Sequence, residues 1–193
     1  MDTSKAIFFL ALMAATFLTS NSFSIDGHID QALLEDLRGA ALDQINFYRN
    51  LHGAPPVQLN DALNTIAQAN SEKMAETMSL KHSEEAVDGR FGENIFMMGS
   101  GPAPIQYNLN AVESWYDEIN FYDFDSGKST DPSEDIGHFT AMVWDDVKEI
   151  GLGYQAFKIP YNEQIDIVYV YVTLNLSPTP NILGTYTAHV HPK

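Results

Sequence analysis

The chemistry open to this chain is limited by the nucleophiles that it lacks. Its 193 residues include no cysteine, which excludes a thiolate nucleophile, a disulfide framework and a zinc site built from cysteines. The sequence also contains neither a G-x-S-x-G turn nor an H-E-x-x-H pair, the patterns of serine hydrolases and zinc peptidases. Ser83 follows His82 directly, but neighbouring loop residues rarely face each other. What remains is chemistry carried by histidine and carboxylate side chains.

Two such side chains, Glu118 and His138, lie in patterns that favour a role at a site. Glu118 follows Trp115 by three residues, which places it about 60° around a helix, at the edge of the apolar face. His138 follows Gly137 and opens a segment whose apolar residues have helical spacing. The partial positive charge of a helix N-terminus favours a neutral imidazole. Neutral imidazoles beside carboxylates suit Zn²⁺ or another divalent ion, and the same groups suit general acid–base catalysis.

The elements that must position these residues are helices early in the chain and a hairpin late in it. Apolar residues at a period near 3.6 predict the helices, and runs of β-branched and aromatic residues around a turn predict the hairpin. The predicted elements are helices over 30–51, over 61–78 with Asn60 as N-cap, and after 110, loops over 81–94 and 121–137, and strands over 149–158 and 165–176. That order predicts an α+β fold, with helices packed on a mostly antiparallel sheet.

The N-terminus has the pattern of a secretory signal peptide. Lys5 precedes an apolar run over 6–18, and Ser22 and Ser24 fit a small-x-small cleavage site. We expect a signal peptide over 1–24 and a single domain over 25–193, with a core of about 30–184 and a C-terminal tail over 185–193. The alternative, a membrane anchor, needs about 20 apolar residues, and neither this run nor a later one is that long. The expected location is therefore extracellular, with no transmembrane segment in the mature chain.

The charge of the chain argues against two classes of partner. Asp and Glu number 26 against 10 Lys and Arg, a formal charge of −16. Nucleic acids and anionic membranes both require a basic surface, so neither is the expected partner. We expect a monomer or weak dimer. His52 is predicted to end the first helix, and His189 and His191 are predicted to be solvated residues of the tail.

Eight consecutive residues, Gly137 to Trp144, resemble the first signature of the CAP superfamily. This superfamily includes cysteine-rich secretory proteins, antigen-5 venom allergens and plant pathogenesis-related proteins. Segments over 48–56, 80–83, 92–94, 115–119 and 171–178 also occur in family order. The closest resemblance is to the cysteine-poor, Golgi-associated pathogenesis-related type. That type is myristoylated at a glycine in the second position, whereas this chain has Asp2 and the predicted signal peptide.

The resemblance implies an α-β-α sandwich whose large cleft holds two histidines and two glutamates. Carried over to this sequence, that tetrad is His82, Glu93, Glu118 and His138. Three interpretations of the tetrad are open at this stage. It is either a set of hydrogen bonds that fix loops, a Zn²⁺ or Mg²⁺ site with His82 and His138 as ligands, or acid–base machinery. No cofactor is strictly required by the first interpretation.

The resemblance also implies small hydrophobic ligands. Tyr116, Phe121 and Phe124 have the spacing of a caveolin-binding motif, and such a loop is linked to sterol binding in some CAP members. The alternative is that Tyr116 packs in the core while the two phenylalanines anchor the loop. The leading hypothesis is a non-enzymatic extracellular binding protein for sterols, fatty acids or protein partners. A metal-dependent hydrolase acting through the tetrad and an immune-modulating or allergen-like interaction protein are the alternatives.

Overall fold

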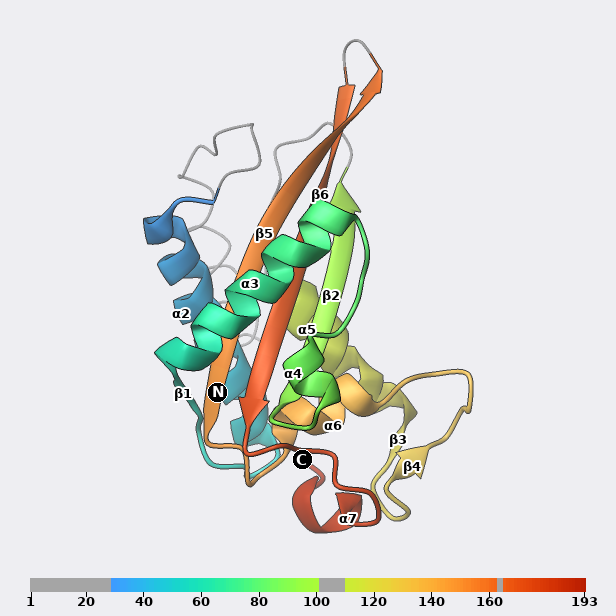
Figure 1. The fold of residues 1–193 in the computed structure, drawn as a ribbon. Helices are drawn as coiled ribbons and strands as arrows, with labels where there is room; N and C mark the ends of the chain where they lie inside the picture. The colour runs from blue at the N-terminus through green and yellow to red at the C-terminus, as the bar shows by residue number, and fades with distance from the viewer. Residues whose placement is uncertain (1–28, 101–109, 163–164) are drawn as a thin grey trace, which may run out of the picture.

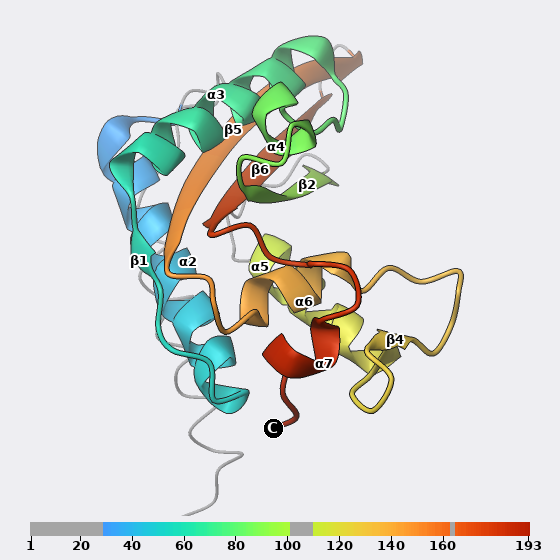
Figure 2. The same ribbon diagram turned by 60° about the horizontal axis from the view of Figure 1, so that its bottom comes forward.

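The computed structural model describes residues 29–100, 110–162 and 165–193, which form three layers (Figure 1). A four-stranded sheet lies between helix α3 on one face and helices α2, α5 and α6 on the other (Figures 1 and 2). This is the α+β, α-β-α arrangement that the sequence predicts. The predicted signal peptide and its cleavage site at Ser24 lie outside the described residues. Within the described part of the chain, no helix is long and apolar enough to cross a membrane.

The two long helices start where the sequence predicts. Helix α2 spans Gln31–Leu51, and the carboxylate of its N-cap, Asp30, accepts a hydrogen bond from the Leu33 amide at 2.9 Å. Helix α3 spans Asp61–Thr77 and is capped by the Asn60 side chain. The α3 prediction errs at its end, because Met78 is the left-handed C-cap and is 58% exposed rather than on the inner face.

Between α3 and the hairpin, the structure holds more regular elements than the sequence predicts. The predicted loop over 81–94 contains helix α4 and the start of strand β2, and the predicted loop over 121–137 contains a two-stranded ribbon. Glu118 lies not in an α-helix but at the start of a 3₁₀ turn. The elements of this region are α4 (Glu84–Val87), β2 (Gly92–Ser100), α5 (Asn110–Asp117), η1 (Glu118–Phe121), β3 (Tyr122–Asp123), β4 (Lys128–Ser129) and α6 (Gly137–Val143).

The predicted hairpin forms the centre of the sheet. Strand β5 (Glu149–Asn162) pairs antiparallel with β6 (Ile165–Ser177), and β6 pairs antiparallel with β2. The short strand β1 (Gln58–Leu59) adds a parallel edge to β5, giving the order β1-β5-β6-β2. The sheet is therefore mostly antiparallel, as predicted, and β2 is an edge strand.

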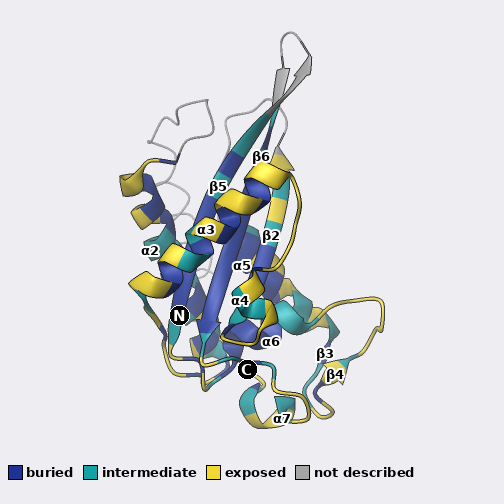
Figure 3. Ribbon diagram, viewed as in Figure 1, coloured by how far each residue is buried: buried dark blue, intermediate teal, exposed yellow. Residues whose placement is uncertain are grey.

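Each face of the sheet meets its helical layer differently. The main apolar core lies against α2, α5 and α6. Figure 3 shows that the central strands β5 and β6 are largely buried between the helical layers. On the opposite face α3 approaches the sheet very closely. A Cβ atom added to Gly151 or Gly153 would lie 2.1 Å from the Leu63 carbonyl carbon or 2.3 Å from the Ala67 one. Only glycine fits at these two positions of β5.

Polar side chains complete the edge of β5 beyond its short contact with β1. Asn64 accepts from the Leu152 amide at 2.9 Å, and Gln68 accepts from the Tyr154 amide at 3.1 Å. Arg38 donates to the Leu152 carbonyl at 2.7 Å. These contacts satisfy backbone groups that an uncovered edge strand would leave open, and they fix α3 along the sheet.

Arg49, at the end of α2, joins distant parts of the chain although it is fully buried. Its guanidinium donates to the backbone carbonyls of Pro55, Met142, Trp144 and Val147 at 2.8–2.9 Å. Burial lowers the pKa of Arg49 to about 10, so the group remains charged at neutral pH. It thereby ties the end of α2 to the segment that connects α6 with β5.

Candidate functional site

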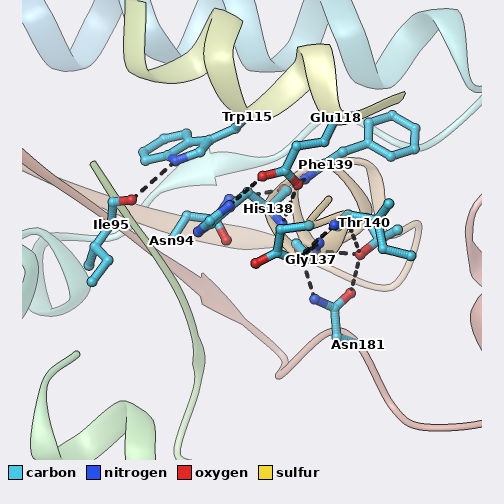
Figure 4. Close-up of polar contacts among 11 residues, drawn as sticks. Asn94, Ile95, Trp115, Glu118, Gly137, His138, Phe139, Thr140 and Asn181 are labelled. Atoms are coloured by element: carbon cyan, nitrogen blue, oxygen red, sulfur yellow. Dashed lines mark hydrogen bonds and ion pairs between the residues drawn. The ribbon is translucent and has the colours of Figure 1, made fainter. Parts of the chain in front are cut away.

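Glu118 and His138 form the first half of the predicted tetrad (Figure 4). The His138 ring contacts Glu118 through Nδ1, 2.5 Å from Oε1. The other carboxylate oxygen accepts from the backbone amides of His138 at 2.9 Å and Phe139 at 3.0 Å. These amides belong to the first turn of α6, whose own N-cap, Ile136, gives no side-chain bond. Glu118 therefore caps α6 from another element while it orients the imidazole.

Neighbouring residues fix the position of His138. The Trp115 ring lies over the imidazole with centroids 6.3 Å apart and an interplanar angle of 26°. The Asn94 side chain donates to the His138 carbonyl at 3.0 Å. Asn181 donates to the Gly137 carbonyl and accepts from the Thr140 hydroxyl, both at 2.8 Å. Figure 4 shows these contacts converging on the N-terminal turn of α6.

His82 and Glu93 form the second half of the tetrad. His82 Nδ1 lies 3.0 Å from Glu93 Oε1, which also accepts from the Ser83 amide at 2.8 Å. The Ser83 hydroxyl donates to Oε2 at 2.8 Å, and the Asn175 amide, with its nitrogen facing the carboxylate, donates at 3.1 Å. Only 1% of the Glu93 side chain is exposed, against 46% for His82. The hydrogen bond to Glu93 raises the pKa of His82, against the smaller opposing effect of partial burial.

Strand β2 connects the two pairs. Consecutive side chains of a strand point to opposite faces, so Glu93 meets the α3 side of the sheet while Asn94 reaches α6 on the other. The next residue, Ile95, accepts from the Trp115 indole through its carbonyl at 3.4 Å. Adjacent residues of one edge strand thus serve both halves of the tetrad, Glu93 by pairing with His82 and Asn94 by its bond to His138.

The hydrogen bonds divide the tetrad into occupied carboxylates and available imidazoles. Each carboxylate accepts at least three hydrogen bonds, whereas neither histidine has a partner for Nε2 in the described part of the chain. A carboxylate on Nδ1 is the arrangement that presents Nε2 to a metal ion. Among the described residues, no three ligand atoms of the tetrad lie within 4.8 Å of one another. Among the described residues, the group of three ligand atoms within 4.8 Å of one another lies elsewhere, at Asp145, Asp146 and His189.

A comparison with known families identifies the domain. The model of the cysteine-rich secretory protein family, CAP, matches residues 42–172, a span that contains the whole tetrad. This chain belongs to the CAP family.

Relatives of this CAP domain occur in animals, fungi and plants. The human Golgi-associated plant pathogenesis-related protein 1 is 41% identical over 108 residues, covering 56% of this chain and 66% of that protein. Human cysteine-rich secretory protein 3 is 31% identical over 129 residues, covering 63% and 51%. The chain therefore spans less than two thirds of these curated relatives. Pathogenesis-related protein PR-1 of Medicago truncatula is 30% identical over 145 residues, covering 75% and 79%.

Solved CAP structures share the fold. The crystal structure of NaASP2 with Zn²⁺ superposes with a TM-score of 0.56 at 21% identity and covers 86% of this chain and 90% of that one. The structure of MpPR-1i gives 0.52 at 13% identity, covering 82% and 97%. At these identities the likeness concerns the fold alone.

Of the three aromatic residues of the predicted lipid motif, Tyr116 and Phe124 pack against the ring of Phe139. Tyr116 is buried and stacks on Tyr48 with centroids 3.7 Å apart. Phe124 is half-buried and meets the ring of Phe139 edge-on at 6.3 Å. Phe121, also half-buried, accepts from the Thr130 amide through its carbonyl at 2.7 Å. Two of the three rings are thus held by core contacts, and a role in lipid binding stays a prediction.

Sequence reasoning missed the surroundings of the other histidines. His52 ends α2 as predicted, but it is buried, with Nδ1 2.5 Å from the His191 carbonyl and Nε2 3.0 Å from the Tyr116 hydroxyl. The expectation that His189 is solvated needs correction, because its ring stacks on Trp144, contacts Asp145 and is 25% exposed. His191 is 44% exposed and also contacts Asp145. The signal available in the sequence was an Asp-Asp pair and a His-x-His pair, but nothing in their spacing placed them together.

Proposed function

We propose that this chain is a secreted, non-enzymatic CAP-domain binding protein in which His82 and His138 bind a divalent metal ion. The observation that carries the proposal is the difference in hydrogen bonding between the two glutamates and the two histidines of the tetrad. Each glutamate is occupied by hydrogen-bond donors, and each imidazole keeps Nε2 available. Such a site can bind a ligand without catalysing a reaction on it.

The donor set fits a metal ion. Two imidazoles, each oriented through Nδ1 by a carboxylate, match the way in which proteins present neutral histidines to Zn²⁺. A bound ion would supply Lewis acidity and an attachment point for an oxygen-bearing ligand. The CAP structure of NaASP2 with Zn²⁺ supports this choice of ion. In this chain His82 is 46% and His138 27% exposed, so both rings are open to solvent from which an ion can enter.

The same hydrogen bonds disfavour the hydrolase alternative. A general base must direct a free carboxylate lone pair at the water that it deprotonates. The Glu93 oxygens already face the His82 ring, the Ser83 amide and hydroxyl and the Asn175 amide, and the side chain is 1% exposed. Releasing Glu93 for catalysis would leave these buried donors without partners, which is costly.

A sterol or fatty acid is the proposed cargo, through the family resemblance and the aromatic cluster around Tyr116 and Phe124. This part of the proposal stands apart from the metal site, since the aromatic rings contact the core rather than the tetrad imidazoles. The two parts therefore need separate readouts.

Native mass spectrometry of the secreted protein reads out both parts. We expect a lipid-sized additional mass on protein purified without added ligand. Zn²⁺ added after EDTA treatment is expected to bind with one equivalent fewer in the His82→Ala/His138→Ala variant than in the unmodified protein. If no lipid-sized mass is found while Zn²⁺ still binds, the proposal of a lipid cargo is refuted and the metal site stands. An unchanged Zn²⁺ stoichiometry in the double variant would refute the metal site.

A turnover assay tests the non-enzymatic claim. The protein is incubated with ester and peptide substrates, with and without EDTA. We expect no activity that depends on the tetrad. Turnover that EDTA abolishes, and that both His82→Ala and His138→Ala remove, would overturn the claim and establish the hydrolase.

A further inference from the structure

A second group of metal-ligating side chains lies outside the tetrad, where the end of the chain meets the segment between α6 and β5. Asp145 and Asp146 follow Trp144 in that segment. His189 is the last residue of the short helix α7 (Tyr186–His189), and His191 comes two residues later. Among the described residues, Asp145, Asp146 and His189 form the group of three whose ligand atoms all lie within 4.8 Å of one another.

The distances within this group are close to those around a bound ion. His189 Nδ1 lies 2.6 Å from Asp145 Oδ1 and 3.6 Å from Asp146 Oδ2. Tetrahedral Zn²⁺ with bonds of about 2.0–2.1 Å separates neighbouring ligand atoms by roughly 3.3 Å. Small movements of the side chains are therefore enough to place all three around one ion.

The group is held in place by packing and by a further histidine. The His189 ring stacks on Trp144 with centroids 4.5 Å apart and an interplanar angle of 19°, and Trp144 is 2% exposed. The Asp145 amide donates to the His189 carbonyl at 3.2 Å. His191 Nε2 lies 3.2 Å from the second oxygen of Asp145. A histidine on the far oxygen of a ligating carboxylate is the kind of outer partner that orients metal ligands.

We propose that Asp145, Asp146 and His189 bind a divalent transition-metal ion such as Zn²⁺, independently of the tetrad, with His191 orienting Asp145. One imidazole and two carboxylates supply nitrogen and oxygen donors that suit Zn²⁺ and Cu²⁺. On binding, the ion takes the place of the proton between His189 Nδ1 and Asp145, and the neutral imidazole then carries its proton on Nε2. The negative charge of the chain favours cation binding. The buried charge of Arg49 interacts with Asp145, but its guanidinium N–H groups donate to backbone carbonyls rather than to this group.

The two tryptophans give the two histidine sites separate optical reporters. Trp115 lies beside His138 of the tetrad, and Trp144 lies beside His189. In a Trp115→Phe variant all tryptophan emission comes from Trp144. Cu²⁺ is a suitable probe because it quenches indole emission at contact distance and binds nitrogen and oxygen ligands most tightly among the divalent ions of its row.

The experiment is a Cu²⁺ titration of the full secreted protein carrying Trp115→Phe. We expect quenching of Trp144 that saturates as a single Cu²⁺ fills this group, whatever the tetrad binds. A further Asp146→Asn change should raise the dissociation constant at least tenfold. Asp146 suits this test because its side chain is 69% exposed, so its loss leaves the fold intact. His189→Gln should remove the saturable phase, and far-UV circular dichroism verifies that each variant is folded.

The matched control is His138→Gln in the same Trp115→Phe background. It should leave the quenching of Trp144 unchanged, because His138 belongs to the tetrad. Quenching that survives both Asp146→Asn and His189→Gln, or that never saturates, would overturn the proposal. Quenching that disappears in the His138→Gln control would assign the bound Cu²⁺ to the tetrad and would also overturn it.

Discussion

Glu118 has two structural functions, and a single substitution removes both. Its carboxylate caps the first turn of α6 and also holds the His138 ring, although it belongs to another element. With 16% of its side chain exposed, these bonds are largely shielded from water. The backbone amides of α6 therefore depend on a side chain that lies about twenty residues earlier in the sequence.

We expect Glu118→Ala to lower the free energy of unfolding by about 1–3 kcal/mol, because it leaves two part-buried amides without acceptors. Urea denaturation followed by circular dichroism measures this change. Glu134→Ala, at an exposed position of the following loop, serves as control and should stay within about 0.5 kcal/mol. An unchanged midpoint for Glu118→Ala would mean that the tetrad is solvated rather than structural.

His52 is a buried histidine whose hydrogen bonds specify its neutral form. The His191 carbonyl can only accept, so Nδ1 carries the proton, and Nε2 then accepts from the Tyr116 hydroxyl. Burial lowers the pKa of His52, and the nearby charges of Lys193 and His191 add to this effect against the His191 carbonyl bond. Burial also raises the pKa of Tyr116 to about 12, so the tyrosine stays neutral over the range in which histidines titrate.

The lowered pKa of His52 predicts a loss of stability in acid. Below the ordinary histidine pKa of about 6.5 the unfolded chain binds a proton that the native His52 does not, so unfolding is favoured as pH falls. We expect the stability advantage of the unmodified protein over His52→Gln to be greatest above pH 6.5 and to shrink through pH 6 and 5. Thermal unfolding of both proteins across this range measures the difference. A difference independent of pH would contradict the assignment.

At the scale of elements, the contact between α3 and the sheet depends on two glycines of β5. Because Gly151 and Gly153 lack side chains, the backbone of α3 lies almost on the strand. The close approach lets Asn64 and Gln68 reach the backbone of β5. It also brings Asn70 to within 3.5 Å of Glu93, so the glycines indirectly support the tetrad.

We expect Gly153→Ala to destabilise the domain by about 3 kcal/mol or more, because the added carbon would overlap the backbone of α3, which cannot turn aside as a side chain would. Gly39→Ala is the matched control. Gly39 lies within α2 with nothing within 4 Å of its added Cβ, and alanine there should stabilise the helix by about 0.5–1 kcal/mol. Chemical denaturation of both variants tests the opposite signs.

The elements with strong periodicity could be predicted from the sequence, whereas short ones could not. Helices α2 and α3 and the β5–β6 hairpin each carry a long apolar pattern, and the caps Asp30 and Asn60 have side chains suited to that role. Helix α4 has four residues, none of them buried. Strand β2 begins with polar residues that serve the tetrad, so its start has no strand pattern. In both places tertiary contacts outweigh local preference.

The same contrast applies to the sites. The four tetrad residues were predicted through family motifs, and the structure places them in two pairs, His82 with Glu93 and Glu118 with His138. The group around Asp145 and His189 depends on a contact between positions 44 residues apart. No periodicity or motif encodes such a contact, because it arises from the path of the chain after β6.

For the whole molecule, Arg49 joins the first helix to the segment that leads into β5. Its guanidinium serves four backbone carbonyls from three parts of the chain and has no carboxylate partner among them. The Trp144 carbonyl also accepts from the Val147 amide at 3.1 Å. The buried charge is thus stabilised by peptide dipoles, with the nearby carboxylate of Asp145 adding a favourable interaction. The Trp144 carbonyl immediately precedes Asp145, so Arg49 also fixes the backbone beneath the proposed second metal site.

We expect Arg49→Met to cost about 3–5 kcal/mol, a large part of the 5–15 kcal/mol that stabilises a typical domain. Arg49→Lys should recover part of the loss, since an ammonium has three donors but not the planar fork. Urea denaturation measures both variants, and Arg90→Met, at an exposed position, controls for the loss of a surface charge. A cost for Arg49→Met no larger than that of the control would show that water replaces the guanidinium.

The order of strands in the sheet has a consequence for how the chain folds as it is made. Strand β2 is synthesised early, but its neighbour in the sheet is β6. Ile95 therefore cannot pair until its partner Thr173 has been synthesised. Until β6 leaves the ribosome, the apolar run Ile95–Met98 has no strand to pair with. Folding thus requires closure of a long loop, which is slow, and the unpaired strand is open to association with other chains. In the living cell, β2 is the segment that a chaperone would have to shield until synthesis of the hairpin is complete.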